Sequence, residues 1–419
     1  MREFNFESTP IVDIVNNIIV DSIMRRASDI HFDPHEKFLK IRIRVDGELI
    51  DYSLVDNEHK KNLITRVKLL AGMNITESRL PQDGSIKSKI SGKELDLRVS
   101  SLPTSFGEKI VIRILDYYLS LEGLEKLDFT RENYLKINKM LASTNGIVLV
   151  TGATGSGKST TVYSMLQKLN NEKTNIITVE DPVEMSIEGL NQVAVNSEIG
   201  LDFATCLRSI LRQDPNVILI GEIRDSETAR IAIRASITGH LVLSTLHTNN
   251  SLATIERLLD MGIQRYMLAS SIKGIISQTL AKRLCPICKI KRAATYDEKI
   301  LFKKVLNIDT DYVYEARGCN KCHDGYTGRI ALQEVLYMTD EIKEAINNNI
   351  PKDKLKLKVY NTGTKTLLQD GLIKVLNGQT DLKEVFKLVD FDENDALFNE
   401  KKKEEHKEVK NVFNNLREN

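Results

Sequence analysis

The sequence lacks any run of apolar residues that reaches the length of about 18 needed for a membrane-spanning helix. It also lacks a charge excess, because 59 Lys and Arg stand against 58 Asp and Glu, for a formal net charge of +1. We therefore expect no membrane anchor and no direct nucleic-acid binding through bulk charge. The N-terminus, MREFN, shows no apolar segment of signal-peptide type, which favours a cytoplasmic protein. Cysteine is scarce, with five residues, and in a reducing compartment paired cysteines suggest a metal rather than disulfides.

What is present is an ordinary globular composition, with 41% apolar and 28% charged residues. The first part of the chain mixes helical periodicity with alternating strands. A helix is predicted over residues 8–26, with Thr9 as its cap and Pro10 as its first helical residue. Pairs of turn-forming residues at 46–47 and 91–92 separate the strands, which indicates antiparallel hairpins.

From about residue 125 onward the pattern changes. Short apolar runs lie at residues 147–151, 176–179, 217–220 and 241–243, and helical patterns separate several of them. This alternation predicts an α/β fold, with a parallel sheet covered by helices. Residues 330–390 have mainly helical patterns, and the tail after Asn399 is dominated by Lys, Glu and Asn. We expect the tail to be a solvated end.

Residues 152–159, Gly-Ala-Thr-Gly-Ser-Gly-Lys-Ser, match the phosphate-binding pattern G-x-x-x-x-G-K-[ST] between a predicted strand and a predicted helix. The glycines let backbone N–H groups turn toward phosphates, and the helix N-terminus adds partial positive charge. Lys158 is predicted to contact the β- and γ-phosphates of ATP, and Ser159 to ligate Mg²⁺. The expected nucleotide contacts are Gly152, Thr154, Gly155, Ser156, Gly157, Lys158, Ser159 and Thr160.

Hydrolysis also requires acids that position the metal ion and the attacking water. Two acidic segments follow predicted strands: one runs from Glu180 to Glu184, and the other is Glu222 after Gly221. Ligands of open α/β sheets bind at the carboxyl ends of the strands, so both segments can face the loop. The alternative is that these carboxylates only cap strand-to-helix turns.

Four of the five cysteines form two CxxC pairs. The pairs are Cys285 with Cys288 and Cys319 with Cys322. Two such pairs can surround a tetrahedral ion, and four thiolates leave no open position, so a structural Zn²⁺ site is predicted. The fifth, Cys206, stands in an apolar helical pattern and is expected to be a small buried side chain.

At this point the chain resembles the ATPases of type II secretion and type IV pilus assembly, throughout residues 8–390. The matching strings are ASDIHFDP at 27–34, RVDGE at 44–48, LPQDG at 80–84, the phosphate-binding loop, EDPVE at 180–184, IGEIRD at 220–225 and the segment 239–249. The resemblance implies a RecA-like P-loop motor domain behind a smaller, PAS-like α/β domain. It also implies a homohexamer that acts on an inner-membrane platform protein and, indirectly, on pilin subunits, so that the protein associates peripherally with the membrane.

The resemblance assigns roles to individual residues. Glu222 resembles the glutamate that orients or activates water, and Glu180 and Glu184 resemble acids near the magnesium and the water. His247 resembles the histidine that senses the γ-phosphate, and His240 resembles a second histidine of the same segment. The family arginines that stabilise phosphoryl transfer match Arg98, Arg113, Arg208 and Arg212, and Arg224 and Arg257 match family arginines whose roles are less defined. Ordinary surface or salt-bridge arginines are the alternative.

Three departures limit what the resemblance transfers. Gly221 stands where general P-loop enzymes have Asp, a feature that this family shares. Thr279 stands where the family often has Arg, so the role of that arginine is not carried over. The chain begins almost at the 27–34 segment, so we expect no extra N-terminal docking domain of the kind that binds cyclic-di-GMP in some assembly ATPases.

The expected domains are an N-terminal α/β domain (1–116), a linker (117–125), the RecA-like ATPase core (126–284), a tetracysteine zinc module (285–328), a C-terminal helical region (329–396) and a charged tail (397–419). The predicted function is hydrolysis of ATP to drive assembly of a type IV pilus or of the pseudopilus of type II secretion. The resemblance favours assembly over retraction, because assembly-type members of the family commonly carry such a tetracysteine module and retraction-type relatives usually lack it. The alternatives are a DNA-uptake or retraction motor of the same superfamily and, in another class, a nucleic-acid-dependent RecA-type ATPase or a scaffold that binds nucleotide without hydrolysis.

Overall fold

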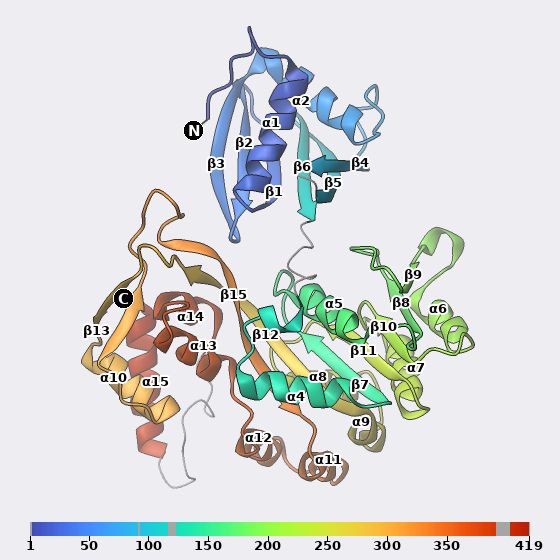
Figure 1. Ribbon diagram of the computed structural model, residues 1–419, viewed down its shortest axis with the longest axis vertical. Coiled ribbons are helices and arrows are strands. Elements are labelled where there is room, and N and C mark those ends of the chain that lie inside the picture. Colours follow the sequence, from blue (N-terminus) through green and yellow to red (C-terminus); the bar gives the residue numbers. More distant parts are fainter. Residues whose placement is uncertain (1, 91–92, 116–122, 391–402, 419) are drawn as a thin grey trace. The chain divides into compact units, whose positions relative to one another are not determined.

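The computed structural model describes residues 2–90, 93–115, 123–390 and 403–418. The chain divides into two compact units, Met1–Tyr117 and Tyr118–Asn419 (Figure 1). The predicted turn at residues 91–92 lies outside the described residues, as does the expected linker up to residue 122. Leu124 was expected in the linker, but it is buried at 1% exposure in the core of the second unit.

The first unit is a six-stranded antiparallel sheet in the order β3-β2-β1-β6-β5-β4, with two helices. Its elements are α1 (Ile11–Met24), β1 (Ala27–Pro34), β2 (Phe38–Val45), β3 (Glu48–Asp56), α2 (Asn57–Leu70), β4 (Gln82–Ile90), β5 (Lys93–Thr104) and β6 (Gly107–Leu115). The predicted turn between β2 and β3 is confirmed, since Asp46 and Gly47 both have positive φ. The predicted cap of α1 is wrong: Pro10, extended at ψ 142°, is the N-cap residue, so Thr9 lies one residue too early.

The two faces of this sheet differ in chemistry because side chains alternate along each strand. Ile30 and Phe32 of β1 are fully buried, in one core with the apolar sides of α1 and α2. The alternating residues Asp29, His31 and Asp33 therefore lie on the opposite face. The acids pair with cations of the neighbouring strands, for example Asp29 with Arg113 of β6.

The second unit is built on a seven-stranded sheet in the order β15-β12-β7-β11-β10-β8-β9. Its strands are β7 (Gly146–Thr151), β8 (Ile176–Glu180), β9 (Asn191–Ala194), β10 (Val217–Ile220), β11 (Leu241–Leu246), β12 (Ile272–Leu284) and β15 (Tyr326–Tyr337). All neighbours pair in parallel except β12 and β15, which are antiparallel. The predicted α/β fold with a parallel sheet is confirmed. Residues 330–337, expected to be helical, instead form part of the edge strand β15.

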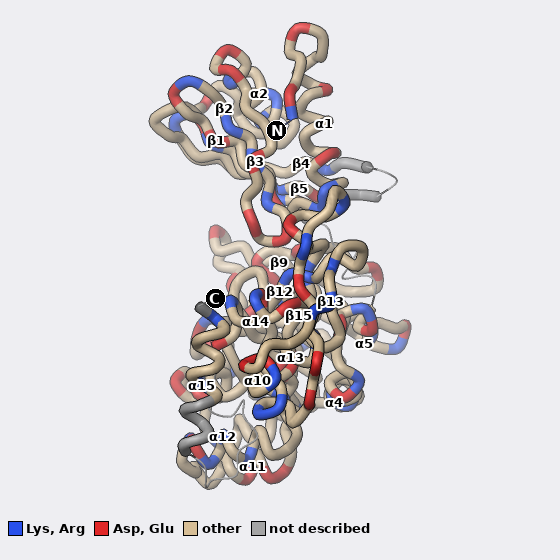
Figure 2. The backbone as a smooth tube through the Cα atoms, turned by 90° about the vertical axis from the view of Figure 1, so that its left-hand side faces the viewer, with Lys and Arg blue, Asp and Glu red and all other residues tan. Residues whose placement is uncertain are grey.

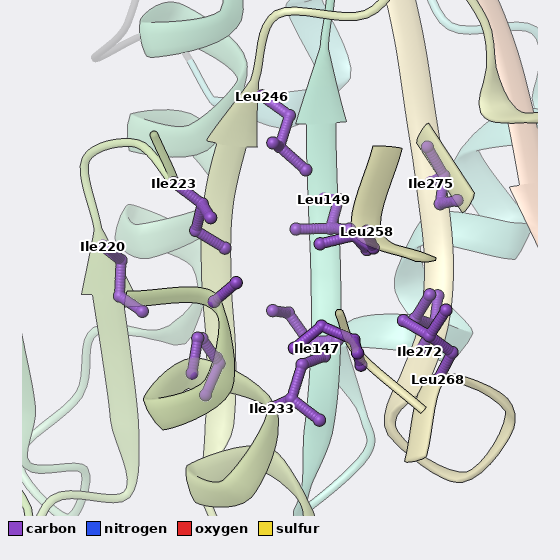
Figure 3. Packing of buried hydrophobic residues seen from close by; sticks show 14 of the residues in the cluster. Ile147, Leu149, Ile220, Ile223, Ile233, Leu246, Leu258, Leu268, Ile272 and Ile275 are labelled. Atoms are coloured by element: carbon purple, nitrogen blue, oxygen red, sulfur yellow. The ribbon is translucent and has the colours of Figure 1, made fainter. Parts of the chain in front are cut away.

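Helices cover both faces of the sheet, as its continuous apolar strands require. One face carries η1 (Leu124–Lys126), α4 (Arg131–Leu141) and α5 (Lys158–Leu169), and the other carries α6 (Phe203–Ile210), α7 (Ser226–Ile237), α8 (Ser251–Asp260) and α9 (Arg265–Ser271), while η2 (Ser197–Ile199) lies between β9 and α6. Alternate residues of β7 pack into the cores on the two faces of the sheet. Ile147 and Leu149 pack with Ile233 of α7 and Leu258 of α8, as Figure 3 shows. Cys206 is buried at 4% exposure in the same core, as predicted.

The cysteine-bearing segment lies between β12 and β15, followed by helices. It contains β13 (Ile290–Ala293), α10 (Tyr296–Leu306) and β14 (Tyr312–Glu315), and the following helices are α11 (Asp340–Asn347), α12 (Lys352–Asn361), α13 (Leu367–Leu376), α14 (Leu382–Leu388) and α15 (Lys403–Glu418). The tail is not simply a solvated end. Helix α15 buries Val409 and Phe413 in a core shared with α10, α13 and α14. Its apolar residues recur at helical spacing, which supplies the buried face.

The distribution of charged residues agrees with the near-zero net charge. Basic and acidic segments are interspersed in both units in Figure 2. Within the described part of the chain, no helix has the length and hydropathy to span a membrane.

Candidate nucleotide and metal sites

The phosphate-binding loop joins the central strand β7 to α5. Gly152, Gly155 and Gly157 all have positive φ, at 147°, 80° and 86°, where L-residues with a side chain are strained. Gly157 is the N-cap of α5, so the free N–H groups of the first helical turn lie at the end of the loop. The loop therefore has the backbone of an anion-binding turn.

The polar side chains of this loop divide by exposure. Thr154 and Ser159 are exposed, and Thr160 is partly exposed, whereas Ser156 is buried. The ammonium group of Lys158 donates to the carbonyl oxygens of Gly152 and Ala153, both at 2.9 Å. Burial lowers the pKa of Lys158, and the nearby charge of Glu222 opposes that shift. Lys158 and Glu222 are thus close enough to interact across the carboxyl ends of β7 and β10.

Glu222 follows β10 and lies between the side chains of Arg224 and His247. Arg224 donates to its Oε1, and Nε2 of His247 lies 3.4 Å from its Oε2. Burial would raise the pKa of Glu222, but the hydrogen bond and charge of Arg224, with His247, hold it below its ordinary value. Arg224 also reaches Asp181, with Nη1 3.5 Å from Oδ2. Glu222 is therefore an ionised carboxylate fixed in place beside the loop.

Gly221, at the position where general P-loop enzymes carry Asp, lies against β8. Its N–H donates to the Val179 oxygen at 2.8 Å, and a Cβ built on it would lie 3.3 Å from the Glu180 Cα. A side chain there would press on the backbone of β8. The close pairing of β8 and β10 gives a physical reason for glycine at this position.

Glu180 ends β8 and is 4% exposed. Its Oε1 accepts from Thr178 at 2.6 Å and from Gln192 at 3.2 Å, and its Oε2 accepts from the Tyr163 hydroxyl of α5. Burial and the charge of Glu180 raise the pKa of Tyr163. Glu180 thus joins β8, β9 and α5 through internal hydrogen bonds, which fits a structural carboxylate as well as a ligand.

The other predicted catalytic residues are more dispersed. The backbone N–H of Glu184 donates to Tyr163 Oη at 3.1 Å, which places it beside Glu180. Arg208 of α6 pairs with Glu227 of α7, and Arg212 donates to the Arg208 carbonyl at 2.7 Å. The Nδ1 of His240 lies 3.0 Å from the carbonyl oxygen of Ala235, so this ring contacts the end of the preceding helix α7.

Arg98 and Arg113 belong to the first unit. They lie opposite each other on β5 and β6, and the Arg113 Nε donates to Asp29 at 3.1 Å. The side chain of Arg113 is 67% exposed. The roles that the family resemblance assigns to these two arginines stay predictions.

The four predicted metal ligands lie together. The sulfur atoms of Cys285, Cys288, Cys319 and Cys322 are all within 4.8 Å of one another. Antiparallel pairing brings them there: β12 ends directly before Cys285, and β15 begins four residues after Cys322, with Leu284 opposite Tyr326. The Cys285 N–H donates to the Gly325 oxygen at 2.8 Å, which closes the base of the module. Four sulfurs at these separations could hold one metal ion.

Gln278 is the main site residue that sequence reasoning missed. It lies on β12 beside the phosphate-binding loop, and its amide contacts both Ser156 and Thr161. Gln278 carries no signal in the sequence, because nothing in the residues around it places this strand next to the loop. Tyr163 was missed for the same reason.

Comparison with known proteins assigns the chain to a family. Residues 5–387 match the family described as Type II/IV secretion system protein. The chain belongs to this family. Among its relatives, the type IV pilus assembly ATPase PilB of Myxococcus xanthus (strain DK1622) is 46% identical over 384 residues, covering 90% of this chain and 68% of that protein. The type II secretion system ATPase E of Vibrio cholerae serotype O1 (strain ATCC 39315 / El Tor Inaba N16961) is 43% identical, covering 91% and 76%.

Solved structures of secretion-system and pilus ATPases share the fold of this family member. The pilus retraction motor PilT with bound ADP has a TM-score of 0.62 at 26% identity, covering 90% of this chain and 96% of that chain. The ATPase DotB of Legionella pneumophila has a TM-score of 0.66 at 21% identity, covering 92% and 97%, and shows the fold alone. The curated relatives at higher identity act in type II secretion and pilus assembly, so the assembly branch is better supported than the retraction branch.

Proposed function

We propose that the chain is a Mg²⁺-dependent ATP hydrolase that works as a cytoplasmic homohexamer and drives assembly of a type IV pilus or of a type II secretion pseudopilus. The observation that carries this proposal is that the phosphate-binding loop with Lys158 follows β7 and the carboxylate Glu222 follows β10, at the carboxyl ends of two strands that both pair in parallel with β11. Membership of the secretion family and relatives named as PilB and type II secretion ATPases support the cellular role.

Each group at this edge has a distinct task in the proposed reaction. The loop N–H groups and Lys158 bind the phosphates, and exposed Ser159 is available to Mg²⁺. Glu222, kept ionised by Arg224 and His247, orients the attacking water. Glu180 ends β8 and Glu184 follows it, one strand farther out, and their proposed action near the magnesium and the water rests on the family resemblance. Mg²⁺ neutralises charge developing on the phosphates when it is bound.

The remaining partners follow from the family. An inner-membrane platform protein would receive the motion, and pilin subunits would be moved indirectly. A structural Zn²⁺ is the proposed occupant of the four-cysteine cluster, because four thiolates leave no open coordination position. The proposed action of Arg98, Arg113, Arg208 and Arg212 on the nucleotide rests on the family resemblance.

Steady-state hydrolysis by the purified chain tests the enzyme. We expect Lys158→Ala to abolish nucleotide binding, and Glu222→Gln to lower kcat at least about 100-fold while ATP still binds. Glu256→Gln on α8, which makes the same change to a half-exposed carboxylate paired with Lys352, is the control and should keep the wild-type rate. Unchanged hydrolysis in Lys158→Ala would refute the site.

Counting surface filaments in cells that carry Glu222→Gln at the native locus tests the role. Loss of filaments, or of secretion where no filament is made, supports assembly. An excess of filaments would indicate a retraction motor instead, and loss of DNA uptake alone would indicate a competence motor. ATP hydrolysis that depends on added DNA would favour the nucleic-acid-driven class.

A further inference from the structure

Strand β12 brings a buried glutamine to the phosphate-binding loop. β12 pairs in parallel with β7, with Ser277 opposite Thr151, and the two hydroxyls lie 2.9 Å apart. The next residue on β12, Gln278, is therefore level with Gly152, where the loop begins. Its side chain is only 3% exposed, so its amide must find partners within the protein.

Both ends of the amide are used, and both contacts belong to the loop and its helix. Gln278 Nε2 donates to the Ser156 carbonyl oxygen at 2.7 Å, and Oε1 accepts from the Thr161 hydroxyl at 2.9 Å. The orientation is consistent, because the NH₂ group faces a carbonyl and the carbonyl group faces a hydroxyl. One side chain thus ties the turn of the loop to the first turns of α5.

The loop glycines make room for this side chain. A Cβ on Gly157 would lie 3.1 Å from Gln278 Nε2, and a Cβ on Gly152 would lie 2.3 Å from the Gln278 backbone oxygen. β12 therefore approaches the loop so closely that a side chain at Gly152 would clash with its backbone. Gln278 and Ser156 are buried at this contact, whereas Thr154 and Ser159 of the same loop are exposed.

We propose that Gln278 is a positioning residue of the phosphate-binding loop. By holding the Ser156 carbonyl and the Thr161 hydroxyl, it fixes the backbone between them, so that the N–H groups of residues 157–160 are in place before the nucleotide arrives. Preorganised donors bind a ligand more tightly because no conformational entropy is lost in ordering them when the ligand binds. The proposal rests on the proposed function, since it concerns binding of the nucleotide phosphates.

Gln333 provides a matched control on the neighbouring strand. It lies opposite Gln278 in the β12–β15 register and is fully buried. Its amide, however, donates to the Leu127 oxygen at 3.1 Å and accepts from Lys374 at 3.5 Å, so it makes neither of the two loop contacts. Replacing either glutamine by Met removes a buried amide of the same size from the same sheet.

The test compares Gln278→Met with Gln333→Met in the full chain, by steady-state ATP hydrolysis and by equilibrium binding of a fluorescent ATP analogue. We expect Gln278→Met to raise both KM and the Kd of the analogue about tenfold, which corresponds to about 1.4 kcal/mol, with kcat within about twofold of wild type. Gln333→Met should leave KM and Kd at the wild-type values, even where both variants lower the melting temperature alike.

Two further variants keep the proposal falsifiable if Gln278→Met folds poorly. Thr161→Val removes one of the two bonds from the helix side, in a nearly isosteric change, and should raise KM by about threefold. Gln278→Glu replaces the donor to the Ser156 carbonyl by a second acceptor and should raise KM more than Met does. Equal KM values for Gln278→Met and Gln333→Met, or a wild-type KM in Thr161→Val, would overturn the proposal. Absence of hydrolysis in the wild-type chain would instead refute the proposed function.

Discussion

Lys374→Met removes the cation of an ion pair that lies inside the second unit. Lys374 and Asp370 occupy successive turns of α13, with side chains 2% and 0% exposed, and Nζ lies 2.6 Å from Oδ2. The ammonium group also donates to the Ala331 oxygen, and the Gln333 N–H donates to the same carboxylate oxygen at 2.8 Å. The pair therefore joins α13 to β15, the edge strand of the sheet.

The size of the effect follows from leaving a carboxylate buried without its cation. Breaking one side of such a pair costs about 3–5 kcal/mol of unfolding free energy, whereas replacing both partners by apolar groups is often neutral. Burial already raises the pKa of Asp370 against the attraction of Lys374. Without Lys374 that pKa rises further, so the folded state takes up a proton at a higher pH. A carboxyl group whose pKa is higher in the folded than in the unfolded state lowers the free energy of unfolding. This loss is complete above the folded-state pKa and disappears as pH falls to the unfolded-state pKa.

Urea unfolding at pH 5 and pH 8, with hydrogen exchange of the β15 and α13 amides as the local probe, measures this effect. We expect the Lys374→Met deficit to be smaller at pH 5 than at pH 8. The double variant Asp370→Leu/Lys374→Met should recover most of the loss at both pH values. The reasoning is refuted if the single variant unfolds within about 1 kcal/mol of wild type at pH 8, or if its deficit grows on acidification.

Three further predictions concern the candidate catalytic carboxylate Glu222, the cysteine cluster and the tail. Arg224→Gln removes the hydrogen bond and charge that lower the Glu222 pKa against burial, so the acid limb of the pH–rate profile should move to higher pH; an unmoved limb contradicts this. Cys288→Ser should abolish bound metal, measured by atomic emission, and lower the melting temperature, whereas full metal content would exclude this ligand. Phe413 is 1% exposed, and its ring centroid lies 4.8 Å from that of Phe386. Phe413→Ala should therefore lower local stability by about 3–5 kcal/mol, measured as faster hydrogen exchange in α10 and α15. Unchanged exchange would show that α15 is not docked.

Local patterns in the sequence were enough for the parts of the site that are close together in the chain. The phosphate-binding loop, its strand β7 and its helix α5 were all predicted, because the motif and the strand and helix patterns around it lie within residues 146–169. The strands before Glu180 and Glu222 were predicted for the same reason. The two CxxC pairs were predicted as one cluster because a tetrahedral ion requires four ligands.

The sequence by itself therefore determined the fold class, the family and the residue types of the candidate nucleotide and metal sites. Only the tertiary structure decided which groups meet. Gln278 reaches the loop because β12 lies beside β7, more than 100 residues away in the chain, and β15 was mistaken for helix because it is stabilised by pairing with β12. The tail forms a helix with one buried face because α10 and α14 offer that face an apolar surface. Periodicity and motifs record local preferences, whereas strand neighbours and buried contacts depend on free energies summed over the whole unit.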